Sequence, residues 1–177
     1  MKIAVCGSSN NYDKEIARKA FEMGKELAGK NVLVLTGACM GYPHEAAKGA
    51  FSANGKVFGI SPAKDETEHI KKYNFPTDSF TEIEYTGLGI PGRNFLLVNE
   101  ADAVIIISGQ IGSLNEFTIA FYYNKIIGIL KNSGGITNMI EQIAEICDKN
   151  GEKGNIVYSG DAKELVQLVI NKLKAIN

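Results

Sequence analysis

The chain has 177 residues, of which 45% are apolar and 22% charged, with a formal net charge of −1, and this suits one globular domain spanning residues 1–177. Proteins that neutralise nucleic-acid phosphates usually carry a clear basic excess, so the charge predicts no nucleic-acid partner. No apolar run reaches membrane-spanning length and no leader pattern follows Met1, so we expect no membrane contact and a cytosolic location.

Apolar, β-branched runs alternate with amphipathic helical patterns along the chain. In chain order, the sequence predicts a strand at 3–6, a helix at 13–28, a strand at 32–35, a helix at 44–54, strands at 56–60 and 82–85, a helix at 92–100, a strand at 103–107, a helix at 113–123, a strand at 126–130, a helix at 136–149, a strand at 156–158 and a helix at 161–175. This alternation predicts an α/β fold, a Rossmann-like, doubly wound parallel sheet with helices on both faces.

One long segment, residues 61–79, shows no regular pattern. It is polar and has a proline near each end, at Pro62 and Pro76. Long loops beside ligand sites often act as lids, and they are also found as ordinary surface excursions. Both interpretations remain open for this segment.

Three glycine-containing turns follow predicted strands. Ligands of open α/β sheets bind outside the carboxyl ends of the strands, where unpaired helix-start amides attract anions. The turn before the helix at 113–123 is the strongest signal, and none of the three matches the G-x-G-x-x-G fingerprint of classical NAD binding. We therefore expect phosphate or nucleotide contacts at Gly7, Ser8, Ser9, Gly37, Gly41, Ser108, Gly109, Gln110, Gly112 and Ser113.

Arg93 and Glu116 each have a functional and a structural interpretation. Arg18 and Arg93 are the only arginines among nineteen basic residues, and Arg93 follows Pro-Gly at a helix start. Its planar fork suits a phosphate or a carboxylate, although a surface arginine is the alternative. Glu116 completes a Ser-x-x-Glu capping box that begins at Ser113, and local sequence alone favours capping over chemistry.

The three cysteines, Cys6, Cys39 and Cys147, lie far apart and form no Cys-x-x-Cys pair. An odd, scattered set argues against a disulfide framework and against a zinc site. We expect three reduced thiols, no metal and no resident cofactor.

The sequence resembles the LOG-like family, long mislabelled as lysine decarboxylases. That family carries Arg-Lys on a helix, then a strand, then Pro-Gly-Gly-x-Gly-Thr-x-x-Glu. Here Arg93-Asn94 and the stretch from Ser108 to Glu116 occupy these places with matching spacing. The departures are Ser108 for proline, Gln110 for glycine, Ser113 for threonine, Asn94 for lysine and Asn115 for a frequent glutamate. The Arg-Asn form of the motif is closer to the branch of the family that includes a molybdenum cofactor carrier protein.

The resemblance implies hydrolysis of the N-glycosidic bond of a nucleoside 5′-monophosphate, with Arg93 and Glu116 as the catalytic pair. The alternative is a non-catalytic carrier or sensor that binds a molybdopterin-type cofactor or a nucleotide. The resemblance also implies a homodimer, for which residues 95–98 and 117–123 offer apolar surface. Lysine decarboxylation is rejected, because no lysine stands in a recognisable pyridoxal phosphate site.

Overall fold

A seven-stranded parallel sheet forms the centre of the structure, a computed structural model that describes residues 1–10, 13–148 and 151–176. Neighbouring strands lie in the order β4-β3-β2-β1-β5-β6-β7, and every pair is parallel. This confirms the predicted doubly wound α/β sheet. The strands are β1 (Lys2–Gly7), β2 (Leu33–Thr36), β3 (Val57–Ser61), β4 (Glu82–Tyr85), β5 (Ala103–Ile107), β6 (Ile126–Leu130) and β7 (Ile156–Ser159).

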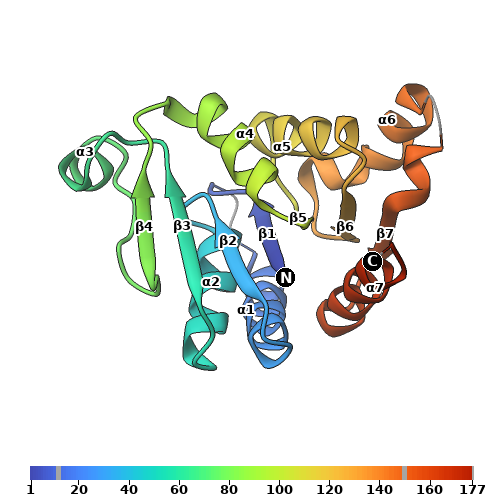
Figure 1. The fold of residues 1–177 in the computed structure, drawn as a ribbon, viewed down its shortest axis with the longest axis horizontal. Helices are drawn as coiled ribbons and strands as arrows, with labels where there is room; N and C mark the ends of the chain where they lie inside the picture. The colour runs from blue at the N-terminus through green and yellow to red at the C-terminus, as the bar shows by residue number, and fades with distance from the viewer. Residues whose placement is uncertain (11–12, 149–150, 177) are drawn as a thin grey trace.

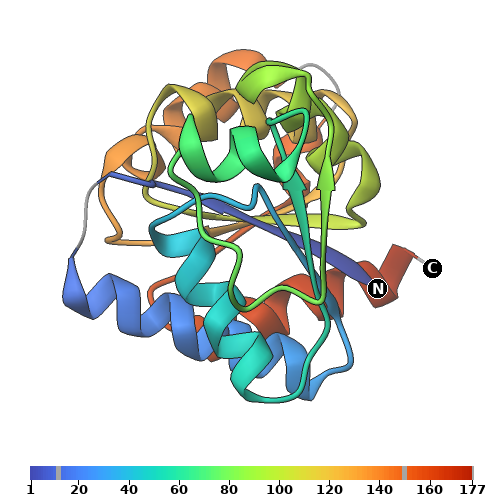
Figure 2. The same cartoon turned by 90° about the vertical axis from the view of Figure 1, so that its left-hand side faces the viewer.

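Helices cover both faces of the sheet (Figures 1 and 2). One layer contains α1 (Lys14–Gly29), α2 (Tyr42–Ser52) and α7 (Ala162–Ile176), and the other contains α4 (Gly89–Glu100), α5 (Ile111–Tyr122) and α6 (Ile140–Cys147). The short α3 (Glu66–Lys71) lies outside the edge strand β4, as Figure 1 shows. Two 3₁₀ turns, η1 (Gly135–Asn138) and η2 (Glu152–Asn155), precede α6 and β7. Among the described helices, none combines the length and apolarity needed to cross a bilayer.

The two cores follow from the alternation of side chains along each strand. In β1, Ile3 and Val5 pack under α1, α2 and α7, whereas Ala4 and Cys6 pack under α4, α5 and α6. Every residue of β5 is buried. Because helices cover both faces, the central strands read as continuous apolar runs in the sequence.

The connection order creates one switch point in the sheet. From β1 the chain adds β2, β3 and β4 on one side, and then returns to place β5 on the other side of β1. The loops after β1 and β5 therefore diverge to opposite sides of the sheet, which leaves a crevice at their carboxyl ends.

The helix starts differ from the predicted ones where the backbone turns sharply. Helix α5 begins at Ile111 rather than 113, because Ser108 (φ 56°) and Gly109 (φ 101°) reverse the chain directly after β5. The helix predicted at 136–149 is divided into η1 and α6, and its residue 149 lies outside the described residues. The segment 61–79 is not irregular throughout, since it contains α3.

Candidate functional site

A cavity of about 220 Å³ opens at the switch point. It lies between the turn after β1, the turn after β2, the start of α5 and the buried face of α4. Its polar lining includes Ser8, Ser9, Arg93, Asn94, Gln110, Ser113 and Glu116. The site therefore gathers side chains from four segments that are far apart in the sequence.

Arg93 lies on the inner side of α4 and is only 4% exposed, so the interpretation as a surface arginine is wrong. Its Nη1 is 3.9 Å from Glu116 Oε1, a long ion pair. Its Nε has no hydrogen-bond partner among the described residues. A buried guanidinium with an unsatisfied donor is costly, and an anionic oxygen would satisfy it.

Gly37 makes room for this guanidinium. A Cβ atom at Gly37 would lie 1.5 Å from Arg93 Nη1, so no other residue fits there without displacing the arginine. The next residue, Ala38, is buried and has a φ of 50°, and its N–H donates to Thr36 Oγ1 at 3.1 Å. The strained turn after β2 thus presents bare backbone to Arg93.

Glu116 faces the cavity and does not cap α5. The N-cap of α5 is Gln110, which makes no side-chain cap bond, and Ser113 is the third residue of the helix. This register places Glu116 in the second turn, beyond reach of the N-cap amide, so the capping interpretation is wrong. Glu116 is 6% exposed, and burial raises its pKa to about 7, although Arg93 and a hydrogen bond from the Cys6 thiol act in the opposite direction.

Two cysteines line the same cavity. Burial raises the pKa of the Cys6 thiol, and the carboxylate of Glu116 raises it further. Burial also raises the pKa of Cys39, while Arg93 opposes this shift. Both thiols are therefore protonated, and neither acts as a thiolate nucleophile near neutral pH.

The candidate phosphate contacts divide into two groups. Those that line the cavity are Gly7, Ser8, Ser9, Gly37, Gln110, Gly112 and Ser113. The remaining three, Gly41, Ser108 and Gly109, are not among the lining residues. A Cβ at Gly41 would meet Ser8 O at 2.1 Å, and the Ser108 N–H donates to Ser133 Oγ at 2.8 Å. These three residues support the turns.

The two asparagines that depart from the family pattern contact one another. Asn94 Nδ2 donates to Asn115 Oδ1 at 3.0 Å. With its amide turned the other way, Asn94 would donate to Glu116 Oε1 at 3.3 Å. A neutral amide pair thus stands at the two positions where the family pattern has lysine and a frequent glutamate, and Asn94 borders the carboxylate of Glu116.

Several lining residues were missed in the sequence. Cys6 and Cys39 carried no motif, although each stands at the carboxyl end of a strand or in the turn that follows. Ile90 precedes the Pro-Gly-Arg motif, and Phe75 comes from the segment 61–79. Only the folded chain brings Phe75 to this cavity. Across the part of the chain that the structure describes, no cluster of three or more His, Cys, Asp or Glu residues could hold a metal ion.

Comparison with known proteins adds a family and several related structures. The model of the SLOG cluster4 family matches residues 1–166. An uncharacterised protein from Archaeoglobus fulgidus is 31% identical over 132 residues, covering 74% of this chain and 80% of that protein. The crystal structure of TM1055 is 26% identical and covers 96% of this chain and 98% of its own, with a TM-score of 0.82. These matches confirm the resemblance to the LOG-like group.

Two more distant structures share the fold. The molybdenum cofactor binding protein from Rippkaea orientalis is 23% identical, with a TM-score of 0.80 over 96% of this chain and 95% of that one. DNA processing protein A from Helicobacter pylori, described by its single-stranded DNA binding mode, is 18% identical, with a TM-score of 0.69 over 97% of this chain and 80% of that one. The prediction that excluded a nucleic-acid partner is therefore wrong. Net charge is a sum over the whole surface and does not describe a local binding site.

Proposed function

This chain belongs to the SLOG cluster4 family, and from its cavity we propose that it binds a phosphate-bearing small molecule, such as a nucleotide, in the cytosol. One observation carries the proposal: Arg93 is buried at the cavity wall, its Nε is unpaired among the described residues, and its carboxylate neighbour is 3.9 Å away. A guanidinium held in this way suits a bidentate contact to phosphate oxygens.

The start of α5 supplies a second feature that favours an anion. Gly112 and Ser113 line the cavity and belong to the first turn of α5. The amides of a first turn have no intrahelical acceptors and carry partial positive charge. Arg93 and this helix end would therefore act together on one phosphate group.

Glu116 supports an extension of the proposal to hydrolysis. A carboxyl group with a pKa near 7 can accept and return a proton at neutral pH. In the reaction, the bond between the base and C1′ breaks, and a water oxygen adds to C1′ while Glu116 takes the water proton. Glu116 returns this proton, which the leaving base takes up directly or through solvent, and ribose 5-phosphate is the second product. The anionic carboxylate would also stabilise the oxocarbenium-like transition state.

The second candidate is a carrier that holds its ligand without turnover. The structural relatives include a molybdenum cofactor binding protein and the molybdenum cofactor carrier protein of Chlamydomonas reinhardtii. In a carrier, Arg93 and the α5 amides would bind the phosphate of a pterin cargo, and the protonated form of Glu116 would leave the site less negative. Both candidates use the same cavity residues, and turnover separates them.

The test is an assay of binding and turnover with nucleoside 5′-monophosphates. We expect a monophosphate to raise the melting temperature of the wild type by mass action, and Arg93→Gln to remove that shift. If the protein is a hydrolase, the wild type releases ribose 5-phosphate, and Glu116→Gln lowers the rate about a hundredfold while binding persists. Binding without release would favour the carrier. An unchanged shift in a folded Arg93→Gln variant would refute the anion site.

A further inference from the structure

Part of the cavity wall is apolar. Phe75, Ile90 and Pro43 line it together with the polar groups at the start of α5. Phosphate alone makes no use of such a wall. Among the described residues that line the cavity, Phe75 is the one aromatic side chain, and a flat ring face is a surface on which another ring stacks.

Phe75 is held in place by the buried imidazole of His69. His69 Nε2 donates to the carbonyl oxygen of Pro76 at 2.9 Å, and its Nδ1 lies 2.8 Å from Ser61 Oγ at the end of β3. The Phe75 N–H donates to His69 O at 3.1 Å, and the two rings meet edge to face at 5.6 Å. The backbone of Phe75 and that of Pro76 are thus tied through His69 to Ser61 at the end of β3.

The ring of Phe75 also contacts Tyr73, with centroids 5.3 Å apart. A side chain fixed by backbone and ring contacts loses little entropy when a ligand binds, so it contributes more to affinity than a mobile one. Phe75 is half-buried, which leaves part of its surface open to the cavity.

We propose that Phe75 is a stacking platform for a planar heteroaromatic ring, so that the site selects ligands that carry both such a ring and a phosphate. The inference rests on the proposed function for the phosphate end and adds the ring end. A purine nucleoside monophosphate and a phosphorylated pterin share this chemistry. The anchored segment around Phe75 determines the preference for a ligand with a planar ring, whereas Arg93 supplies the positive charge that binds the phosphate.

The experiment compares ligands with and without the ring by isothermal titration calorimetry. AMP carries ring and phosphate, ribose 5-phosphate lacks the ring, and a phosphorylated pterin replaces the purine. We expect Phe75→Ala to weaken the binding of AMP about five- to hundredfold, the usual effect of removing a stacking aromatic residue. The affinity for ribose 5-phosphate should change by less than about twofold in the same variant. Tighter binding of the pterin than of AMP to the wild type would identify the pterin as the better occupant.

Three further variants make the result decisive. Phe75→Tyr keeps the ring and should retain AMP affinity, whereas Phe75→Leu keeps apolar volume without a ring face and should behave like Phe75→Ala. Phe51→Ala removes an exposed ring that does not line the cavity and should change nothing. Equal loss of AMP and ribose 5-phosphate, or no loss of AMP, would overturn the inference. If Arg93→Gln leaves ribose 5-phosphate binding unchanged, the proposed phosphate site fails instead.

Discussion

Replacing Glu116 by glutamine tests whether this carboxyl group is buried beside the cavity as described. The side chain is 6% exposed, and burial raises its pKa from 4.5 to about 7, with Arg93 and Cys6 opposing the shift. Each pKa unit corresponds to about 1.4 kcal/mol, so ionising the folded protein costs about 3 kcal/mol more than ionising the unfolded chain. Glutamine cannot ionise, and its side chain has nearly the same shape as that of glutamate.

The sign of the effect follows from proton linkage. Between pH 4.5 and about 7 the folded state binds more protons than the unfolded state, so wild-type stability falls as pH rises. The contribution is fully present below the unfolded pKa and is lost as pH rises through the folded pKa. The free energy of unfolding of Glu116→Gln should therefore gain roughly 2 to 3 kcal/mol on the wild type between pH 5 and pH 8.

Urea denaturation of both proteins at pH 5, 6, 7 and 8 measures this gap. Groups common to both proteins cancel in the difference, and the Cys6 thiol, whose pKa is raised, stays protonated. Glu145→Gln, at an exposed glutamate of α6, serves as the control and should give a flat difference. A flat difference for Glu116→Gln as well would show that the carboxyl group is solvated, and the reasoning would be refuted.

Three further predictions follow from the site and its surroundings. Gly37→Ala should displace Arg93 and weaken phosphate binding at least about tenfold by calorimetry. The control Gly29→Ala should leave binding unchanged, because a Cβ there meets nothing within 4 Å, and equal effects of the two variants would contradict the close approach of Gly37 to Arg93. Sulfate keeps its charge from pH 6 to 8, so its affinity for the wild type should fall about tenfold as Glu116 ionises, and a similar fall in Glu116→Gln would exclude this cause. The homodimer remains a prediction, which light scattering tests: Tyr122, 83% exposed at the end of α5, should lie in the interface, and Tyr122→Glu should then give a monomer.

The strands could be predicted well because buried strands consist of apolar residues that are recognisable in the sequence. Those at 103–107 and 126–130 have the predicted bounds, since a strand covered on both faces is apolar throughout. Arg93 could also be singled out, because its residue type is rare in this chain. Its burial and its unpaired Nε could not be predicted, since they depend on Gly37 from another strand end.

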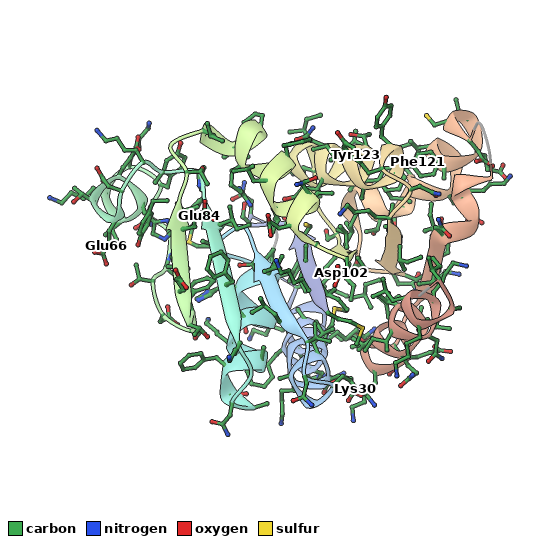
Figure 3. The ribbon with its side chains drawn as sticks, in the orientation of Figure 1. Lys30, Glu66, Glu84, Asp102, Phe121 and Tyr123 are labelled. Carbon is green, nitrogen blue, oxygen red and sulfur yellow. The ribbon has the colours of Figure 1, made fainter. Side chains whose placement is uncertain are left out.

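The role of Glu116 illustrates the limit of local motifs. Ser-x-x-Glu spacing places the two side chains one helical turn apart in any register of a helix. Only the left-handed conformations of Ser108 and Gly109 fix the start of α5, and these depend on packing against the loop after β6. With that start fixed, Glu116 is buried and lines the cavity. Figure 3 labels Phe121 and Tyr123 at the end of the same helix.

The contact between Asn94 and Asn115 constrains how this chain and its relatives can be interconverted by mutation. Asn94 is buried beside both Asn115 and Glu116, so a lysine introduced there alone would place an ammonium group next to the Glu116 carboxylate, whereas a glutamate introduced alone at 115 would meet an amide rather than a cation. We expect a glutamate at 115 to be tolerated better when a lysine stands at 94, because the double exchange places a cation beside it. The two positions are therefore epistatic, and attempts to graft a relative's activity onto this scaffold should change both at once.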